Sequence, residues 1–172
     1  MALAMAASGI HAETADSPTE ALVRLEASLA DELASTEMFL SLCYAVIDPA
    51  RGQLTYANAG HPHAFLVDTA TGAHTRLAAT RPPLGLGGTG TERALSFQHG
   101  HAILCLFTDG LVEARDQRGG GEAFGEQRVL GHVTHLNDRP AQHILEAVFT
   151  HHAAFTGGAP ALDDRTLVLL KI

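Results

Sequence analysis

The sequence has few basic residues, and they do not gather anywhere along the chain. Its 172 residues include 11 lysines and arginines against 19 aspartates and glutamates, which gives a formal net charge of −8. Lys171 is the one lysine, and the arginines are scattered. Nucleic-acid binding needs a basic patch or stripe, so the composition argues against such a partner. An acidic balance is compatible with divalent cations but does not point to a particular site.

The chain has only two cysteines and no apolar run long enough to cross a membrane. Cys43 and Cys105 both lie inside apolar segments, which predicts buried, reduced thiols in a cytoplasmic protein. A membrane-spanning helix needs roughly 18 or more consecutive apolar residues, and the sequence contains no such stretch. We therefore expect a cytoplasmic protein with no membrane partner.

Signatures of covalent and zinc-dependent catalysis are also missing. No Gly-x-Ser-x-Gly segment presents a nucleophilic serine, and neither cysteine has the polar, exposed setting that lowers the pKa of a reactive thiol. The 11 histidines form no His-Glu-x-x-His pair, which is the spacing typical of a zinc site on a helix. Structural or surface histidines are therefore favoured, and only His61, at the end of a predicted strand, is kept as a candidate.

One glycine-rich segment matches a nucleotide-binding pattern in its letters but not in its context. Residues 85–90 fit Gly-x-Gly-x-x-Gly. A dinucleotide site needs a buried strand before this pattern and a helix after it. Here Pro82 and Pro83 precede it and a strand-like segment follows, so the sequence predicts a flexible loop and no cofactor-binding residues.

Hydrophobic periodicity predicts helices and antiparallel strands. Ser17-Pro18-Thr19-Glu20 is a capping box with proline at the first helical position, and leucines at helical spacing follow it. Residues 38–47 are apolar in both alternating sets, which predicts a central strand. The other expected elements are helices over 2–10, 125–135 and 139–155, strands over 53–58, 64–67, 74–77, 93–97, 102–107 and 167–170, and a glycine-rich loop over 116–121. Segregated runs of strands and helices in one domain-sized chain indicate an α+β fold.

The apolar run over residues 102–107 ends in Thr-Asp-Gly. A short apolar run bounded by a turn signal is typical of a strand buried on both faces. Asp109 follows where this strand reaches solvent, and Gly110 gives the backbone freedom behind it. A carboxylate in that place can hold a divalent metal, although the Asp-Gly dipeptide alone is more typical of a turn.

Two further carboxylates precede the last predicted strand. Asp163 and Asp164 lie between a Gly/Pro loop and the apolar residues 167–170. If this strand pairs with the 102–107 strand, the carboxylates at the two strand ends converge. Mg²⁺ and Mn²⁺ prefer carboxylate ligands, and two such ions can activate water and hold a phosphoryl group. The pattern alone supports a metal site and a turn before a strand equally.

Five short motifs, taken in their order along the chain, resemble a known family. They are Asn58-Ala-Gly-His61-Pro, Pro83-Leu-Gly-Leu, Leu106-Phe-Thr-Asp109-Gly-Leu-Val-Glu113-Ala, Phe124-Gly125 and Asp163-Asp-Arg-Thr-Leu-Val. Each motif is weak by itself. The ordered set spans most of the chain and resembles the SpoIIE/RsbU-like branch of the metal-dependent PPM serine/threonine protein phosphatases.

The resemblance implies a fold, a reaction and a set of site residues. The fold is an α-β-β-α sandwich of antiparallel sheets. The reaction is hydrolysis of phosphoserine or phosphothreonine, typically on a STAS-type anti-sigma-factor antagonist, with Mn²⁺ or Mg²⁺ in a two-metal centre. The resemblance implies Asp109 and Asp163 as catalytic metal ligands, with Asp164 as a lower-ranked ligand position. It implies no protein nucleophile, because the metal ions activate water.

Two features of the resembled family are not found in the sequence. One is an earlier Gly-Asp motif, whose aspartate bridges the two metals, and the other is an Asp-x-x-Gly-His-Gly stretch before the first helix. We therefore expect residues 1–172 to form a single domain that is the C-terminal portion of a SpoIIE-type phosphatase domain, with its first strands missing. The alternative to an active enzyme is an inactive fragment or pseudophosphatase that acts as a protein-interaction module.

The same resemblance suggests partners. They are a phosphorylated STAS-type protein as substrate and an upstream sensor domain in a role of signal transduction. Sheet edges left uncovered by missing strands favour some self-association, for which a homodimer is a candidate.

Overall fold

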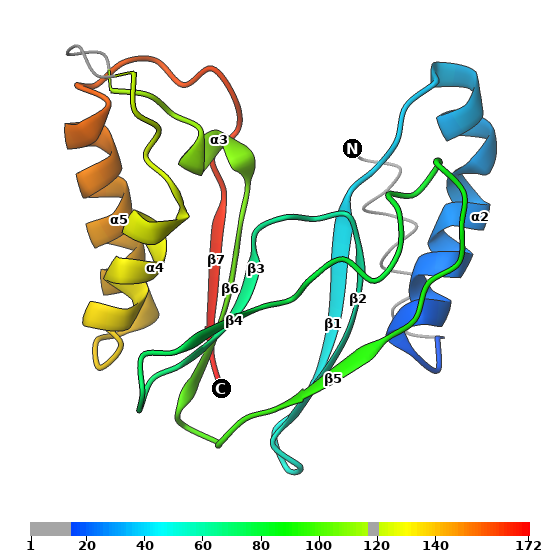
Figure 1. Ribbon diagram of the computed structural model, residues 1–172, viewed down its shortest axis with the longest axis horizontal. Helices are drawn as coiled ribbons and strands as arrows, with labels where there is room; N and C mark the ends of the chain where they lie inside the picture. The colour runs from blue at the N-terminus through cyan, green and yellow to red at the C-terminus, as the bar shows by residue number, and fades with distance from the viewer. Residues whose placement is uncertain (1–14, 117–120) are drawn as a thin grey trace. The chain divides into compact units, whose positions relative to one another are not determined.

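The computed structural model of the chain describes residues 15–116 and 121–172 (Figure 1). The chain divides into two compact units. The first comprises Met1–Pro62 with Leu77–Phe97, and the second comprises His63–Arg76 with Gln98–Ile172. The helix expected over residues 2–10 lies outside the described residues, as does most of the loop expected over 116–121.

Helix α2, Pro18–Thr36, begins the described part of the first unit at the predicted capping box. The Glu20 backbone N–H donates to Ser17 Oγ at 3.2 Å. The Glu20 carboxylate accepts in return from the Asp16 N–H at 2.8 Å, one residue before the position usual in a capping box. The leucines at helical spacing are buried, which confirms the amphipathic helix; they are Leu22, Leu25 and Leu29.

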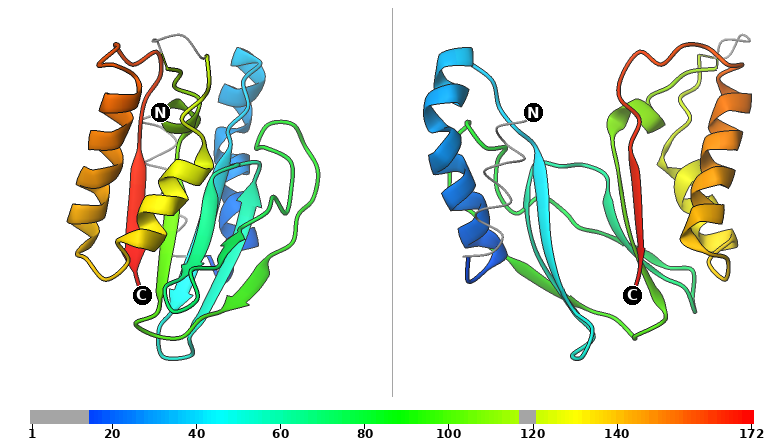
Figure 2. Two further views of the ribbon diagram at one scale, coloured as in Figure 1. Left: turned by 60° about the vertical axis from the view of Figure 1, so that its left-hand side comes forward. Right: turned by 180° about the vertical axis from the view of Figure 1, so that it is seen from behind.

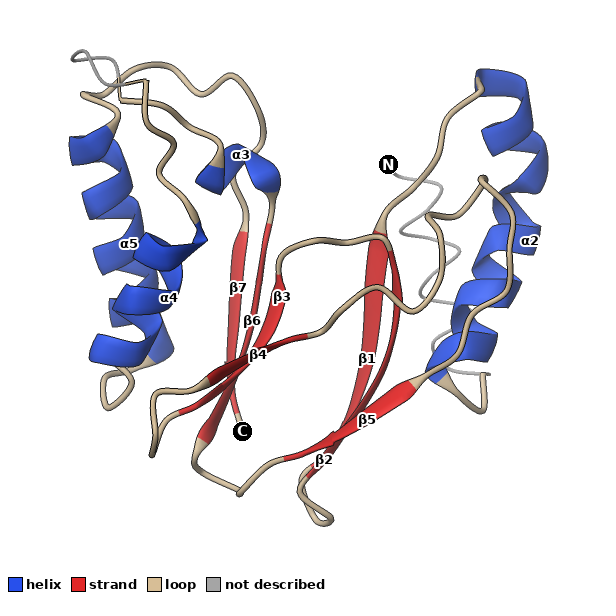
Figure 3. Cartoon of the chain, viewed as in Figure 1, coloured by secondary structure: helices blue, strands red, loops and turns tan. Residues whose placement is uncertain are grey.

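The first unit also holds a three-stranded antiparallel sheet, in the order β1-β2-β5. Its strands are β1 Leu42–Asp48, β2 Gln53–Ala59 and β5 Arg93–Ser96 (Figure 3). Strands β1 and β2 form an antiparallel hairpin, in which Leu42 pairs with Ala59 and Asp48 pairs with Gln53. The buried leucines of α2 form an apolar cluster with Ala57, Ala59 and Leu84, which fixes the helix to this sheet.

The first strand differs from its prediction in two respects. It begins at Leu42 instead of residue 38, because Met38 and Phe39 are exposed and Leu40 pairs with Leu84 only in an isolated bridge. Within the described sheet β1 is an edge strand, so the predicted central position is wrong. Apolar residues in both alternating sets predict burial on both faces, yet the side chains of β1 are half-buried or exposed.

The second unit contains a four-stranded antiparallel sheet in the order β4-β3-β6-β7. Its strands are β3 Ala64–Asp68, β4 His74–Arg76, β6 Ala102–Phe107 and β7 Leu167–Lys171. Strands β3 and β4, both predicted, form an antiparallel hairpin. The predicted burial of β6 on both faces is confirmed as well, since Ile103, Leu104 and Cys105 are all buried.

Three helices complete the second unit, namely α3 Asp109–Val112, α4 Glu126–His135 and α5 Ala141–Phe155. Figure 2 shows α4 and α5 side by side along this sheet. Their apolar stripes pack with β3, β6 and β7 into one core, whose members include Phe65, Ile103, Phe107, Leu111, Val133, Ile144 and Val148. The helices predicted over 125–135 and 139–155 are confirmed, whereas the short helix α3 was not predicted.

Glu126 fixes the start of α4 to the sheet. Its carboxylate accepts from both terminal nitrogens of Arg76, at 2.9 and 2.5 Å, and lies 2.6 Å from His63 Nδ1. The Arg76 guanidinium lies 4.5 Å from the centre of the Phe65 ring, and the His63 ring stacks on Phe107. The helix start is therefore held by charge-assisted hydrogen bonds whose donors rest on the aromatic core.

The predicted α+β class is confirmed by these two antiparallel sheets and their helices. The glycine-rich segment 85–90 is an irregular loop followed by strand β5, as its context predicted. None of the helices in the described ranges is long and apolar enough to cross a membrane.

Candidate metal centre

The last strand pairs with the Thr-Asp-Gly strand, which was the condition for the carboxylates to converge. β6 and β7 are antiparallel neighbours, with Ile103 opposite Lys171 and Phe107 opposite Leu167. The end of β6 and the start of β7 therefore lie at the same edge of the sheet. Asp109 follows β6 at this edge, and Asp163 and Asp164 precede β7 there.

Thr108 joins the two strand ends beyond the ladder. Its backbone N–H donates to the Thr166 carbonyl at 3.1 Å. Its hydroxyl donates to the Asp164 carbonyl at 2.8 Å and accepts from the Thr166 N–H at 2.9 Å. A single side chain thus satisfies two backbone groups of the segment that follows Asp163, and it holds that segment against the start of α3.

Gly110 allows the same segment to approach closely. A β-carbon on Gly110 would lie 2.5 Å from the Asp164 carbonyl oxygen and 3.1 Å from the β-carbon of Asp163. Only glycine leaves room for the backbone at this distance. The backbone next to Asp109 therefore packs directly on the backbone at Asp163 and Asp164. This contact brings together two aspartates, Asp109 and Asp163, that lie far apart in the sequence.

The three predicted ligand residues are all exposed. Asp109 Oδ1 accepts from the Gly110 N–H at 2.9 Å, and Asp163 Oδ1 accepts from the Asp164 N–H at 2.7 Å. These local hydrogen bonds orient each carboxylate and leave its second oxygen available. Asp164 contributes its backbone carbonyl to Thr108, which gives this residue a structural role besides its predicted one.

The donor set fits a hydrated hard cation. Mg²⁺ commonly takes one or two protein carboxylates and keeps several waters, and Asp109 with Asp163 can supply such a pair. Among the residues that the structure describes, no group of three or more His, Cys, Asp or Glu side chains could hold a metal ion. The described residues therefore suit an open, water-rich site and not a closed protein cage.

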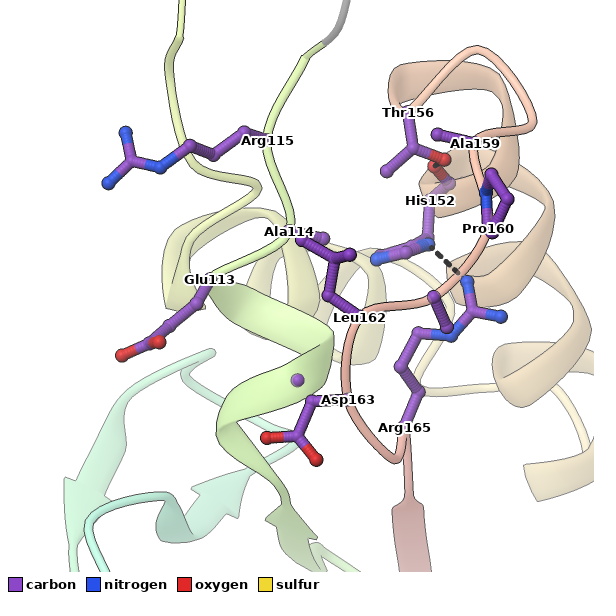
Figure 4. Close-up of a pocket in the computed structure, with 12 residues that line it drawn as sticks. Glu113, Ala114, Arg115, His152, Thr156, Ala159, Pro160, Leu162, Asp163 and Arg165 are labelled. Carbon is purple, nitrogen blue, oxygen red and sulfur yellow. Dashed lines mark hydrogen bonds between the residues drawn. The ribbon is translucent and has the colours of Figure 1, made fainter.

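A pocket of about 360 Å³ has Asp163 in its wall (Figure 4). It is lined by Gly110, Glu113, Ala114, Arg115, His152, Thr156, Ala159, Pro160, Ala161, Leu162, Asp163 and Arg165. His152 on α5 is its one buried imidazole, only 1% exposed. Burial lowers the pKa of His152, and the positive charge of Arg165 acts in the same direction, against a smaller opposing effect of the Leu111 backbone carbonyl.

The sequence reasoning did not single out His152, which it left among the structural or surface histidines. The sequence did contain a sign that His152 is buried. It follows Ile144 and Val148 at a spacing of four residues and so continues the buried stripe of α5. A histidine in the apolar stripe of a helix is buried, and a buried imidazole needs polar partners.

His61 proves to belong to a structural turn of the first unit. The buried Asn58 side chain accepts from the His61 N–H at 2.7 Å and donates to the carbonyls of His61 and Leu77, at 2.8 and 2.7 Å. Gly60 has a φ of 77°, and a β-carbon there would lie 2.7 Å from Pro83 Cγ. The Asn-Ala-Gly-His and Pro-Leu-Gly-Leu motifs are thus packed on each other.

Cys105 is buried, as predicted, whereas Cys43 is only half-buried. Burial raises the pKa of Cys43 to about 12 and the pKa of Cys105 to about 12. Both cysteines are free of disulfide bonds. Neither is a candidate nucleophile, because the thiolate is the reactive form.

Comparison with known proteins agrees with this architecture. The chain is 32% identical over 142 residues to Protein IcfG of Synechocystis, a match that covers 81% of this chain and 22% of that protein. The chain therefore spans only about a fifth of this curated relative.

Two solved structures share the fold. The SiaA-PP2C domain of Pseudomonas aeruginosa matches with a TM-score of 0.85 at 22% identity, over 99% of this chain and 68% of that one. A structure of the PP2C phosphatase domain of SpoIIE from Bacillus subtilis, with a fragment of its regulatory domain, matches with a TM-score of 0.78 at 16% identity, over 98% and 48%.

The family models give the most complete match. The model described as Stage II sporulation protein E (SpoIIE) covers residues 1–172, which is the whole sequence. It includes the Thr-Asp-Gly and Asp-Asp segments that meet at the edge of the second sheet. This chain belongs to the SpoIIE family.

Proposed function

We propose that this chain takes part in metal-dependent hydrolysis of phosphoserine or phosphothreonine on a regulatory protein. The observation that supports it best is the close approach of Gly110 to the Asp163–Asp164 backbone, which brings two exposed carboxylates to one end of the sheet. Family membership supports phosphatase chemistry in general.

Asp109 and Asp163 would hold Mn²⁺ or Mg²⁺, with Asp164 as a further ligand position. When bound, such an ion activates water and neutralises negative charge on a phosphoryl group. The chain itself contributes the orientation of the carboxylates. Thr108 and Gly110 order the segment around Asp163, and the Asp109 carboxylate is fixed by the N–H of the next residue.

The substrate we propose is a phosphorylated STAS-type protein in a sigma-factor regulatory pathway. Its support is the resemblance in the motifs and the match, at a TM-score of 0.77, to a Mycobacterium tuberculosis structure that contains RsbU and RsbW domains. An upstream sensor domain, a homodimer and a cytoplasmic location belong to the same proposal.

A second candidate function is a protein-interaction module without catalysis. It is favoured by one observation, namely that the described residues offer no cluster of three or more metal-binding side chains. A pair of carboxylates binds Mg²⁺ or Mn²⁺ more weakly than a larger set, so such a chain would keep the fold and lose the chemistry.

One experiment separates the two candidates. Mn²⁺ binding is measured by calorimetry, and para-nitrophenyl phosphate turnover is followed in parallel, for the wild type, Asp109→Asn and Asp138→Asn. The Asp138 side chain is 73% exposed and belongs to no candidate site, so that variant is the matched control. The phosphatase proposal expects binding and turnover that only Asp109→Asn abolishes. No Mn²⁺ binding by the wild type would favour the interaction module.

A further inference from the structure

Helices α4 and α5 bring two histidine rings into direct contact. His132 Nε2 lies 2.8 Å from His151 Nδ1, and the ring centres are 5.0 Å apart at an interplanar angle of 73°. The two residues come from different helices, so the packing of α4 on α5 is what joins them. Solvent reaches the pair, because His151 is exposed and His132 is half-buried. Two ring nitrogens therefore face each other at an accessible place on the second unit.

The hydrogen bond between these rings is one of two arrangements that the contact permits. A neutral imidazole carries one N–H and one acceptor nitrogen, so one of the facing nitrogens donates and the other accepts. If the shared proton moves to the far nitrogen of its own ring, both facing nitrogens become acceptors. Burial lowers the pKa of His132, and positive charge on His151 and His135 acts in the same direction. His132 therefore favours the neutral form, which is the form that binds metal ions.

The spacing of the two nitrogens is close to what a tetrahedral ion requires. Zn–N bonds of about 2.0–2.1 Å at a tetrahedral angle place two ligand nitrogens roughly 3.3 Å apart. The separation of 2.8 Å has to widen by about 0.5 Å for such an ion. A small rotation of the exposed His151 side chain provides this movement. The Phe124 ring, whose centre is 5.4 Å from that of His151, keeps the imidazole near its present position.

We propose that His132 and His151 form a binding site for a divalent transition-metal ion, with Zn²⁺ as the expected ion. Their facing nitrogens bind the ion and water completes its coordination, since residues 15–116 and 121–172 contain no group of three or more His, Cys, Asp or Glu that could hold a metal. The proton between the rings moves to the far nitrogen of its own ring, so no proton is lost from the pair.

This site differs in ion preference from the carboxylates at the sheet edge. Imidazole nitrogen suits Zn²⁺, Ni²⁺ and Cu²⁺, whereas carboxylate oxygen and water suit Mg²⁺ and Mn²⁺. An ion held by both rings would tie α4 to α5 and stabilise the folded second unit, because the unfolded chain does not hold the two rings together. The inference does not rest on the proposed phosphatase function.

The site is tested by nuclear magnetic resonance on the full chain at pH 8. Zn²⁺ is titrated while a two-bond ¹H–¹⁵N spectrum follows the histidine rings, and Mg²⁺ serves as the ion that prefers oxygen. We expect saturable changes at His132 Nε2 and His151 Nδ1 with Zn²⁺ and none with Mg²⁺. No saturable change at these two nitrogens, or equal changes with Mg²⁺, would overturn the proposal.

A variant assigns the binding to this pair. His151→Gln keeps a polar side chain and removes one ligand, so Zn²⁺ measured by calorimetry should bind about tenfold more weakly or worse, since even changes outside the ligand shell commonly cost tenfold. His143→Gln is the matched control, because His143 is another exposed histidine of α5, and its affinity should match the wild type. Zn²⁺ should also raise the Tm of the wild type more than that of His151→Gln.

Two outcomes of the variant experiment would contradict the proposal. Equal Zn²⁺ affinity in the wild type, His143→Gln and His151→Gln would show that the ion binds elsewhere on the chain. An equal loss in both variants would show that the effect is not specific to the pair. If His151→Gln does not fold, the changes at the two ring nitrogens of the wild type still decide.

Discussion

Gly110 and Asp164 are in backbone contact, so that a β-carbon on Gly110 would lie 2.5 Å from the Asp164 carbonyl oxygen. We predict that Gly110→Ala destabilises the protein by about 2 kcal/mol or more, because overpacking against backbone cannot relax by a rotamer change. Urea unfolding measures the change. Gly131→Ala is the control, since the position lies in α4 with open space around it and alanine there should stabilise by about 0.5–1 kcal/mol. Equal effects of the two variants would refute the role of the contact.

Thr108→Val tests the hydroxyl that links the two strand ends. The change keeps the shape and removes the hydrogen bonds to the Asp164 carbonyl and from the Thr166 N–H. We expect a loss of about 1–2 kcal/mol in the free energy of unfolding, because two backbone groups lose a partner. Chemical denaturation of Thr108→Val and Thr108→Ser decides: serine keeps the hydroxyl and should retain most of the stability. A neutral effect of valine would contradict the assignment.

Asn58→Asp tests the turn in the first unit. The substitution is nearly isosteric but replaces the amide donors to the His61 and Leu77 carbonyls with a second oxygen. A buried carboxylate facing two carbonyl oxygens should cost about 3 kcal/mol or more of folding free energy. Thermal and urea unfolding measure it. Asn137→Asp, where the amide makes one hydrogen bond to the Thr69 carbonyl, should change stability by about 1 kcal/mol. A milder effect at Asn58 than at Asn137 would contradict this account of the turn.

The lowered pKa of Glu126 should make part of the free energy of unfolding depend on pH. Burial raises its pKa, but hydrogen bonds from Arg76 and His63 outweigh burial, and the net pKa lies below the ordinary value of 4.5. The folded state therefore favours the ionised form of Glu126. Its contribution to the free energy of unfolding is complete at a pH above the ordinary pKa, and it is lost as the pH falls through the lower pKa of the folded state. The Arg76 side chain is 44% exposed, and solvent screening limits the contribution to about 1 kcal/mol.

The measurement is the difference in unfolding free energy between the wild type and Glu126→Gln. This difference should be largest near pH 6 and shrink toward zero as the pH falls through 4 and below. A difference that grows on acidification would reverse the sign of the proposed linkage.

Both thiols should react slowly in the folded protein. With a pKa raised to about 12 for each cysteine, only about one thiol in ten thousand is ionised at pH 8, since each pH unit below the pKa lowers the ratio tenfold. Labelling with a thiol reagent at pH 8 should be slow in buffer and fast in denaturant. Rapid labelling of the native protein would show that burial does not protect these residues.

Much of the fold could be predicted because periodic patterns report burial directly. The β6 run, the α2 capping box and the helices α4 and α5 were recognised for this reason. The pairing of β6 with β7, which the sequence left as a condition, is observed. The position of β1 was wrong because an apolar strand does not reveal how many neighbours it has.

The site was predictable only in part. The sequence placed Asp109 and Asp163 at two strand ends, and the structure brings those ends together, whereas their role as metal ligands stays a prediction. The short helix α3 that begins at Asp109 was not predicted. Gly110 was noted for its backbone freedom, whereas the structure requires it for a close approach to residues distant in sequence. His152 was missed because its partner, Arg165, comes from another element, and such contacts carry no signal of spacing.

The pairing of β6 with β7 also has a consequence for the order of folding. The helices α4 and α5 lie between these strands in the sequence, so Asp109 and Asp163 approach each other only after a long loop has closed. A chain in which β7 has not yet docked offers two isolated carboxylates with no shared affinity. A cation bound by both would stabilise the native state alone, and its binding would report that the second unit has finished folding.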